Sequence, residues 1–441
     1  MKKSEQNIST EMSLNIKKAA STRNGGIKRL TEDEIHTAIS AADSFTGTLC
    51  KFVPASGAAT RMFAPLFGKD DEALALVKKN SEKIAINLST PKDKLAATPK
   101  GLLPFHRYGE SVRTPFEEHL VEGAFYAKDL NDVVNLHFTV SEEHIEEFRK
   151  LLRSKRGAYS KRFGCTYHVS FSTQDPKTDV VAYGADNKPA VKKDGTVLKR
   201  PAGHGALLKN LQSINEDFIF IKNIDNVVKE EYLDDTIKWK RVLLGRAVML
   251  KAQANLLQMN LQSAQGGDEL EEAIAAATSF LEEELLITQK FSAPMGEIAD
   301  YLIGVLDRPL RVCGMVKNQG EAGGGPFICN EEDGSTSLQI LEGVQVEDKE
   351  LLKKSTHFNP VDIVCCIKDC SGAKYRLSEF TDPSTALNVE KTFEGKKVHY
   401  TELPGLWNGS MSRWNTQFIE VPLSTFNPVK SIQDLLRKNH Q

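Results

Sequence analysis

Short apolar runs alternate with helix-like patterns along most of the chain, and this alternation constrains the fold more than any other feature of the sequence. The runs are short and end in turn signals, as β-strands do. They lie at residues 49–53, 133–138, 167–172, 218–223, 311–316, 361–367 and 417–421. Strands that alternate with helices are typical of a mainly parallel sheet covered by helices. We therefore predict an α/β fold with a mainly parallel sheet and flanking helices.

Residues 234–309 interrupt this alternation with a long helical pattern, and we expect a helical insertion there. Two further helix starts are predicted by their first residues. Thr31 opens a capping box with Glu34, and Ser141 is placed to cap the helix that follows it. The predicted parts are an N-terminal helical extension (1–44), a first half of the α/β domain (45–233), the insertion (234–309) and a second half (310–441).

The composition gives no sign of a polyanionic partner or a membrane. Lys and Arg number 57 against 59 Asp and Glu, and the formal net charge is -2, so nucleic acid is not an expected partner. The start lacks an apolar segment, and no stretch is long enough to cross a bilayer. Seven cysteines are few and odd in number, and the run from Cys365 to Cys370 fits a buried strand better than a zinc site. We predict a cytoplasmic protein.

The loop that follows the first predicted strand is built from small residues and has the outline of a phosphate site. It consists of Ala55, Ser56, Gly57, Ala58, Ala59, Thr60 and Arg61. Small side chains let backbone N–H groups approach an anion at a helix N-terminus, and the Arg61 guanidinium can bind a phosphate through two hydrogen bonds. The loop matches neither the Walker nor the Rossmann pattern, and a simple tight turn is the alternative.

Other strands and turns end in residues that suit an anionic or planar ligand. They are Pro99-Lys100-Gly101, Gln174, Pro201-Ala202-Gly203-His204-Gly205 and Asn223-Ile224-Asp225-Asn226. Lys100 is presented from a stiff turn, and Gly203 permits close backbone approach. Open α/β sheets bind ligands at the carboxyl ends of their strands, where a carboxylate such as Asp225 can hold Mg²⁺. The alternatives are that Lys100 only lies in a solvated turn and that Asp225 only closes the strand through an Asx-turn.

In this order, the pieces resemble those of UDP-sugar pyrophosphorylases, the nucleotidyltransferases that make UDP-glucose or UDP-N-acetylhexosamine. That family has a glycine-rich loop, a Pro-Lys turn, a strand-end Gln, a Pro-x-Gly-His-Gly loop, an Asn-x-Asp-Asn strand end and a late Pro-Val-Lys, matched here by Pro428-Val429-Lys430. The resemblance spans residues 45–230 and 415–436 and implies a nucleotide-diphospho-sugar transferase-like fold of the GT-A or Rossmann-like type. This chain departs from the family at Ala58 and Ala59, whose Cβ atoms can crowd a triphosphate.

The resemblance implies attack of a sugar-1-phosphate oxygen on the α-phosphorus of a nucleoside triphosphate, with UTP as the expected one, to give a nucleotide sugar and pyrophosphate. It also implies that residues 45–233 bind the nucleotide and that residues 310–441 bind the sugar. The implied catalytic residues are Arg61, Lys100 and Lys430, and the implied ligand of Mg²⁺ is Asp225. The implied nucleotide contacts are Ala55, Ser56, Gly57, Ala58, Thr60, Gln174, Gly203 and His204.

Sugar contacts are expected in three loops of the second half. The first loop contains Asn318 and Glu321, the second contains Asn359, and the third contains Asn408 and its neighbouring tryptophans. Aromatic faces next to amides are common in carbohydrate sites. The alternative is that the tryptophan-rich loop only packs between domains. Two other functions stay open, a nucleotide or nucleotide-sugar binding protein without turnover and a different phosphotransferase that uses the same loops. The sequence distinguishes neither one sugar from another nor a monomer from a homo-oligomer.

Overall fold

The computed structural model describes residues 14–68, 71–320 and 323–441, and the largest sheet within them has eight strands. In spatial order these are β2 (Ile27–Lys28), β18 (Asn415–Glu420), β12 (Leu310–Lys317), β15 (His357–Cys366), β11 (Phe218–Ile221), β3 (Leu49–Pro54), β6 (Val133–Thr139) and β7 (Thr166–Ser172). All seven strands predicted from the sequence are present in this sheet, and β2 is the eighth.

Neighbouring strands of this sheet run both parallel and antiparallel. Strand β15 pairs antiparallel with β12 and with β11. The other five neighbouring pairs in the described chain are parallel. The sheet is therefore mixed, and the α/β class is confirmed. Because β15 separates β11 from β12, those two strands point the same way, and the carboxyl ends of β3, β11 and β12 lie at one edge of the sheet.

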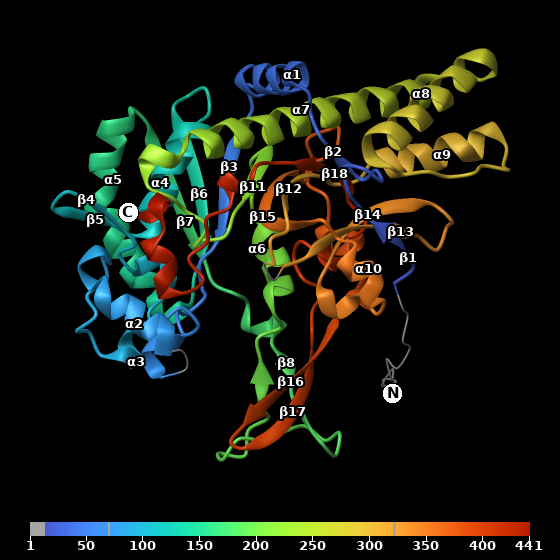
Figure 1. The fold of residues 1–441 in the computed structure, drawn as a ribbon. Coiled ribbons are helices and arrows are strands. Elements are labelled where there is room, and N and C mark those ends of the chain that lie inside the picture. Colours follow the sequence, from blue (N-terminus) through green and yellow to red (C-terminus); the bar gives the residue numbers. More distant parts are fainter. Residues whose placement is uncertain (1–13, 69–70, 321–322) are drawn as a thin grey trace.

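The helices lie outside the sheet, and the longest is α7 (Asp234–Ser263). The others are α1 (Glu32–Asp43), α2 (Asp71–Lys79), α3 (Lys92–Ala97), α4 (Pro115–Tyr126), α5 (Ile145–Phe163), α6 (Leu208–Gln212), α8 (Gly267–Leu285), α9 (Met295–Leu306) and α10 (Lys349–Lys353). Figure 1 shows α1 beside α7, with α8 and α9 near the far end of α7. The helical pattern predicted over residues 234–309 corresponds to α7, α8 and α9.

Helix α1 is held against α7 by a close backbone approach. A Cβ atom at Gly245 of α7 would lie 1.7 Å from the carbonyl oxygen of Ala38 in α1, so only glycine fits there. The predicted capping box at the start of α1 is present, since the Thr31 hydroxyl accepts the N–H of Glu34 and the Glu34 carboxylate accepts the N–H of Thr31. Ser141 does not cap a helix. Its hydroxyl bonds instead to a histidine ring at 2.8 Å, because a 3-10 turn precedes α5.

Several further strands pair outside the main sheet and were not predicted. They are β1 (Ile16–Ala19) with β13 (Gly325–Asn330) and β14 (Thr336–Leu341), β9 (Tyr183–Gly184) with β17 (Lys396–Glu402) and β16 (Leu387–Phe393), β8 (Val180–Val181) with β10 (Lys199–Arg200), and β4 (His106–Tyr108) with β5 (Ser111–Arg113). Strands β16 and β17 form an arm that projects at the bottom of Figure 1. The N-terminal segment contributes β1 and β2 besides α1, so it is not purely helical.

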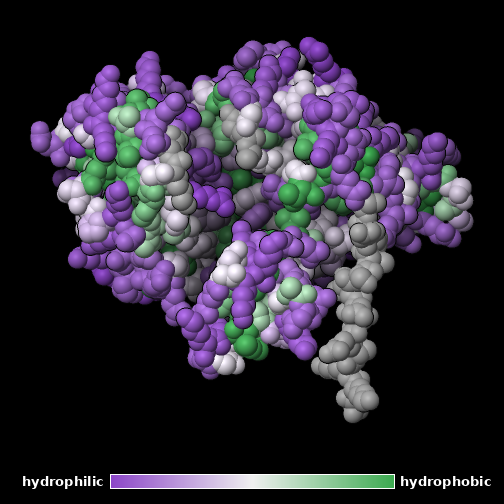
Figure 2. Space-filling view, turned by 60° about the horizontal axis from the view of Figure 1, so that its bottom comes forward, coloured by the Kyte–Doolittle hydropathy of each residue, from purple (hydrophilic) through white to green (hydrophobic). Residues whose placement is uncertain are grey.

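Hydrophilic residues cover most of the face shown in Figure 2, and hydrophobic residues are exposed there in small patches. Across the ranges that the structure describes, no helix is long and apolar enough to cross a membrane. All seven cysteines are free thiols, with Cys365 and Cys366 buried and Cys370 exposed. Cys365 and Cys366 lie in β15, which confirms that they pack in a strand.

Three charged side chains are buried together where α4 packs on the sheet. The Glu122 carboxylate of α4 accepts hydrogen bonds from the ammonium groups of Lys51 in β3 and Lys222 after β11, at 2.7 and 2.8 Å. Burial alone would raise the pKa of Glu122, but Lys222 and Lys51 hold it well below its usual value. Burial lowers the pKa of Lys51 to about 7. This group ties α4 to the two strands that lead to the candidate site.

Replacing Glu122 with glutamine leaves two buried ammonium groups without an anion. We expect Glu122→Gln to lower the free energy of unfolding by about 3–5 kcal/mol, the usual cost of removing one partner of a buried ion pair. Urea denaturation followed by circular dichroism measures the difference. Glu146→Gln is the matched control, because Glu146 forms an exposed pair with Arg149 on α5 and should contribute less than about 1 kcal/mol. Equal stabilities of the two variants would contradict the expectation.

Candidate functional site

Asp225 follows β11 and lies between two ammonium groups. The Nζ atoms of Lys100 and Lys430 are 2.7 and 3.1 Å from its Oδ2 atom. Lys100 Nζ also donates to the carbonyl oxygen of Val429 at 2.7 Å. Asp225 is only 6% exposed, and burial alone would raise its pKa, but Lys430 and Lys100 hold the pKa below its usual value. The carboxylate is therefore ionised at neutral pH and is neutralised by lysines from two distant segments.

These three residues line a cavity of about 1380 Å³ at the edge of the sheet where β3 and β11 end; we call it the Asp225 cavity. Two more cationic side chains, Arg61 and Arg437, and one more carboxylate, Asp434, line the cavity. The remaining lining residues are Pro54, Ser56, Gly57, Ala58, Thr60, Asn223, Ile224, Gln319, Leu423, Ser424, Phe426, Asn427, Pro428 and Ser431. Cationic side chains outnumber anionic ones, which suits an anionic ligand.

The small-residue loop after β3 is held by the segment that ends at Lys100. The N–H of Ala59 donates to the carbonyl of Thr98 at 3.1 Å, and the N–H of Lys100 donates to the carbonyl of Gly57 at 3.4 Å. The intervening chain forms short helices, including α2 and α3, and then returns to the loop. This return places Lys100 beside the loop. The catalytic role that the family resemblance implied for Lys100 stays a prediction.

Only part of this loop faces the Asp225 cavity. Gly57 and Ala58 are exposed and line it, whereas Ala59 is fully buried in an apolar cluster. Of the two alanines that replace family glycines, only Ala58 can therefore crowd a ligand there. Ala55 is also fully buried, and its N–H donates to the carbonyl of Thr139 at 2.8 Å. That N–H is already used within the fold, so Ala55 does not offer it to an anion.

The Pro-Val-Lys segment reaches the cavity because it pairs with the segment around Asp225. The N–H of Val429 donates to the carbonyl of Asp225 at 3.0 Å. The N–H of Asn427 donates to Oδ1 of Asn226 at 2.7 Å. The Asn-x-Asp-Asn strand end and the Pro-Val-Lys segment are thus neighbours in space, although they lie far apart in the sequence.

Asp434 and Arg437 belong to the cavity but were not predicted. The Asp434 carboxylate accepts the N–H of Lys430 at 2.8 Å and that of Ser431 at 2.7 Å, so it fixes the turn that carries Lys430. Arg437 pairs with Asp434 at 2.7 Å. Ser431 and Asp434 form a capping box, and their spacing was the available sequence signal.

The predicted base contacts Gln174, Gly203 and His204 do not line the Asp225 cavity. His204 accepts the N–H of Leu406 at 2.9 Å, and its ring stacks on Trp407 with centroids 4.3 Å apart. Burial lowers the pKa of His204 to about 4, so the ring is neutral at physiological pH. Gly203 has φ +75°, which favours glycine. The Nε2 atom of Gln174 is buried without a partner in the described chain. Contact of these residues with a base stays a prediction.

The predicted sugar contacts are not gathered at the cavity either. The amide of Asn359 donates to a backbone carbonyl of β12 at 3.2 Å, and that of Asn408 to one of β14 at 2.9 Å. Both amides are buried. The side-chain oxygen of Asn318 accepts a nearby backbone N–H at 2.8 Å. Gln319 lines the cavity, and Glu321 lies outside the described residues. Sugar binding by these residues stays a prediction.

Asp225 is the residue at this site that suits Mg²⁺. Magnesium sites for phosphate transfer commonly use one or two carboxylates together with phosphate oxygens of the substrate. Asp225 fits this pattern as a single ionised protein ligand. Nowhere in the described ranges do three or more His, Cys, Asp or Glu side chains gather in a group that could hold a metal ion. Binding of Mg²⁺ by Asp225 stays a prediction.

Helix α4 supports the strand end that carries Asp225. The His119 ring of α4 is fully buried, and its Nε2 atom donates to the carbonyl of Ile224 at 3.2 Å. Burial holds the pKa of His119 well below its usual value, so the ring is neutral. The accepting carbonyl belongs to the residue directly before Asp225. Together with the ion pairs of Glu122, this bond fixes where β11 ends.

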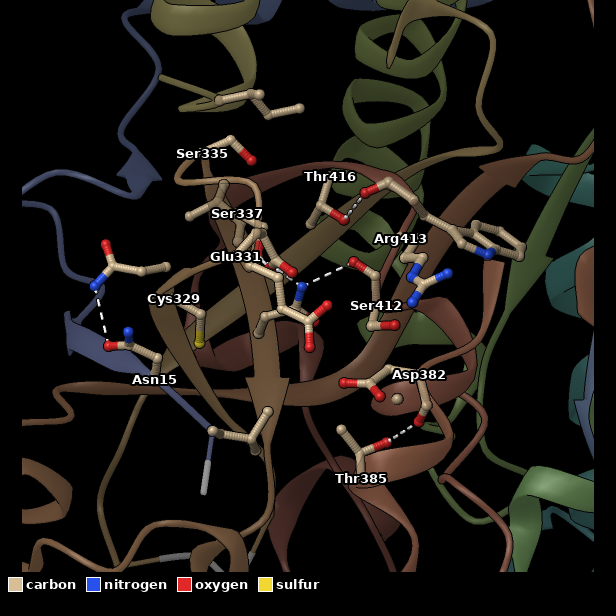
Figure 3. Close-up of a pocket in the computed structure, with 18 of the residues that line it drawn as sticks. Asn15, Cys329, Glu331, Ser335, Ser337, Asp382, Thr385, Ser412, Arg413 and Thr416 are labelled. Atoms are coloured by element: carbon tan, nitrogen blue, oxygen red, sulfur yellow. Dashed lines mark hydrogen bonds between the residues drawn. The ribbon is translucent and has the colours of Figure 1, made fainter. Parts of the chain in front are cut away.

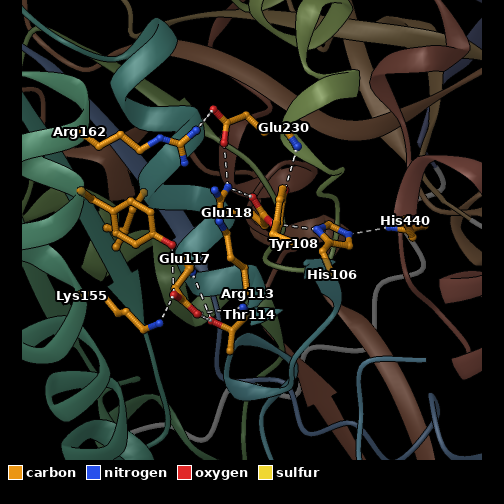
Figure 4. Close-up of polar contacts among 12 residues, drawn as sticks. His106, Tyr108, Arg113, Thr114, Glu117, Glu118, Lys155, Arg162, Glu230 and His440 are labelled. Atoms are coloured by element: carbon orange, nitrogen blue, oxygen red, sulfur yellow. Dashed lines mark hydrogen bonds and ion pairs between the residues drawn. The ribbon is translucent and has the colours of Figure 1, made fainter. Parts of the chain in front are cut away.

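The same helix also holds the C-terminal segment, as Figure 4 shows. Glu118 of α4 accepts the hydroxyl of Tyr108 at 2.9 Å and bonds to Nδ1 of His106 at 2.9 Å. Nε2 of His106 in turn bonds to Nδ1 of His440 at 2.9 Å. Burial lowers the pKa of both histidines to about 3, so both rings are neutral. A chain of buried hydrogen bonds thus links α4 to the segment that contains Lys430.

Glu118 makes this link sensitive to pH. Burial raises its pKa to about 8, although Arg113 acts in the opposite direction. The folded protein therefore keeps a proton that the unfolded chain, with a glutamate pKa of about 4.3, has lost at neutral pH. The resulting stabilisation is complete below about pH 4 and is lost as the pH rises through about 8, with roughly 1 kcal/mol lost between about pH 7 and 9.

We expect Glu118→Gln, which mimics the protonated carboxyl, to remove this part of the pH dependence. Thermal unfolding of the variant and the wild type from pH 6 to 9.5 measures it, and the difference between the two curves isolates Glu118 from other titrating groups. Glu146→Gln serves as the control and should follow the wild type at every pH. Parallel curves for Glu118→Gln and the wild type would show that Glu118 is ionised in the folded state.

Comparison with solved structures confirms the resemblance at the level of fold. UDP-N-acetylglucosamine pyrophosphorylase from Trypanosoma brucei is 13% identical, and the match covers 95% of this chain and 72% of that one with a TM-score of 0.54. A mutant of UDP-glucose pyrophosphorylase from Leishmania major is 14% identical, with coverage of 97% and 70% and a TM-score of 0.48. The first of these two matches shows that the fold is UDP-sugar pyrophosphorylase-like.

The sequence itself matches no curated protein. It does match one family, which is described as a domain of unknown function, DUF4301. The match covers residues 2–96 and 73–441, and so nearly the whole chain. The chain therefore belongs to the DUF4301 family.

Proposed function

We propose that the protein is a nucleotidyltransferase that joins a nucleoside triphosphate, with UTP as the first candidate, to a sugar-1-phosphate and releases pyrophosphate. The observation that carries the proposal is the meeting of Asp225, Lys100 and Lys430 in one cavity beside the small-residue loop. The volume of about 1380 Å³ exceeds the range of single small-ligand sites, which is about 300–1,000 Å³. The cavity therefore has room for two substrates.

The chemistry asks for positioning and charge more than for an acid or a base. A sugar phosphate oxygen forms a bond to the α-phosphorus of the triphosphate, and the bond from that phosphorus to the pyrophosphate oxygen breaks. Both substrates are anions, so the protein must hold them together against their repulsion. Lys100, Lys430 and Arg61 line the cavity. The two lysines can donate hydrogen bonds to phosphate oxygens, and Arg61 can bind a phosphate through two hydrogen bonds.

Phosphates and Asp225 compete for the same two ammonium groups. Without substrate, Lys100 and Lys430 neutralise the carboxylate. A bound phosphate offers the lysines a second partner of higher charge. Asp225 would then be free to hold Mg²⁺, and that ion would offset phosphate charge. Lys100 is only 12% exposed, whereas Lys430 is 59% exposed, so Lys430 has more freedom to change partners.

We expect Lys430→Ala and Asp225→Asn each to lower kcat/KM by about 100-fold or more, because each removes a charge that acts on the phosphates. The assay measures pyrophosphate released from UTP and other nucleoside triphosphates, with Mg²⁺ and a panel of sugar-1-phosphates, by phosphate detection with and without inorganic pyrophosphatase. Lys438→Ala is the matched control, since Lys438 is exposed and does not line the Asp225 cavity. Full turnover by Lys430→Ala would remove the role given to that lysine.

The same assay separates the other functions. Nucleotide binding by thermal shift without any pyrophosphate release would identify a binding protein without turnover. That function is favoured by Ala58, which lines the cavity and whose Cβ atom can crowd a triphosphate. Formation of the nucleoside diphosphate without release of phosphate or pyrophosphate, seen by chromatography of the same reactions, would point to transfer of the γ-phosphate to the sugar, and so to a different phosphotransferase.

A further inference from the structure

A second cavity, of about 460 Å³, lies at the opposite edge of the main sheet (Figure 3). It is enclosed by the β13–β14 hairpin, by Arg308 just before β12 and by residues 412–416 at the start of β18. We call it the Trp414 cavity. Strands β12 and β18 begin here, whereas the Asp225 cavity lies where β3 and β11 end. Since these strands point the same way and the two cavities share no lining residue, they are separate sites.

Charged side chains of both signs surround the Trp414 cavity without pairing. Two are guanidinium groups and four are carboxylates, namely Arg308, Arg413, Glu331, Glu332, Asp333 and Asp382. Within the described ranges, none of the six forms an ion pair at 4.0 Å or less. Figure 3 shows Glu331, Asp382 and Arg413 around the same space. Opposite charges that face one cavity without touching are suited to a ligand that bridges them.

Two cavity-lining residues also carry polar atoms without a partner in the described structure. They are Nε1 of Trp414 and Oγ of Ser412. Trp414 is only 3% exposed, so its N–H has no bulk water to bond with. Buried donors are nearly always paired in folded proteins, and each exception calls for an explanation such as an absent ligand. A ligand in the cavity supplies one.

Hydroxyl groups complete the lining. They belong to Ser335, Ser337, Ser384, Thr385 and Thr416. Some already bond to the carboxylates, as the Ser384 hydroxyl does to Asp382 at 2.7 Å. The cavity thus offers donors and acceptors side by side, and carboxylates outnumber guanidiniums. This excess of negative charge disfavours the binding of a phosphate or another anion.

We propose that the Trp414 cavity binds a neutral polyhydroxylated molecule, such as an unphosphorylated sugar. Each sugar hydroxyl can donate to a carboxylate while its oxygen accepts from a guanidinium, so one ligand can form hydrogen bonds with charged groups of both signs. The N–H of Trp414 and the hydroxyl of Ser412 provide two more contacts. The volume is within the range of small-ligand sites, which is about 300–1,000 Å³. This site is independent of the proposed transferase reaction.

The test is binding to the whole chain, measured by saturation-transfer difference NMR and by titration of tryptophan fluorescence. The neutral probes are glucose, N-acetylglucosamine and maltose, and the charged ones are glucose 1-phosphate and glycine. We expect at least one neutral probe to bind. Arg308→Gln should raise its dissociation constant about tenfold or more, as expected for a lost charged hydrogen bond. Trp414→Phe and Ser412→Ala should each weaken binding severalfold, and their melting temperatures verify that they fold.

Lys430→Ala is the matched control, because it alters the Asp225 cavity alone and should bind the neutral probe as the wild type does. Three results would overturn the proposal. One is that no neutral probe binds. Another is that binding is lost in Lys430→Ala but kept in Arg308→Gln, which would place the sugar in the Asp225 cavity. The third is that only glucose 1-phosphate or glycine binds in a way that depends on Arg308.

Discussion

The pairing of one buried carboxylate with two lysines is the interaction on which the rest of the site depends. Asp225 lies 125 residues from Lys100 and 205 from Lys430 in the sequence, and its ion pairs join the three segments at one edge of the sheet. A carboxylate this little exposed stays ionised only if cations compensate for the lost water. The short helices before Lys100 bring that lysine to the end of β11, and the turn capped by Asp434 does the same for Lys430.

Helix α4 gives this arrangement its rigid base. Glu122 bonds to lysines of two central strands, His119 bonds to the carbonyl beside Asp225, and Glu118 begins the hydrogen-bond chain that reaches His440. A helix that carries so many buried polar groups is costly unless all of them are satisfied, because each unpaired group loses its hydration without compensation. The helix therefore links the strand end to the C-terminal segment through hydrogen bonds.

Much of the fold and part of the candidate site could be predicted from the sequence. Seven strands of the main sheet were predicted because buried strands leave continuous apolar runs, and Lys100, Asp225 and Lys430 were singled out because their motifs occur in the order of a known family. Strands β4, β5, β8, β9 and β10 were missed because they have only two or three residues each, and β16 was missed because its residues are half-buried or exposed. Arg437 was missed because its place at the cavity depends on the turn around Asp434, with which it pairs. The contacts of Asn359 and Asn408 with backbone carbonyls depend on tertiary packing, which a local motif does not reveal.

The uneven distribution of charge around the Asp225 cavity has a kinetic consequence. The chain as a whole carries a formal charge of -2 and so weakly repels polyanions at long range. The cavity, lined by four cationic and two anionic side chains, attracts them once they are near. At physiological salt the Debye length is about 8 Å, so the distant repulsion is largely screened while the local attraction persists inside the cavity. Capture of an anionic substrate is therefore governed by the field at the mouth of the cavity rather than by the net charge of the molecule.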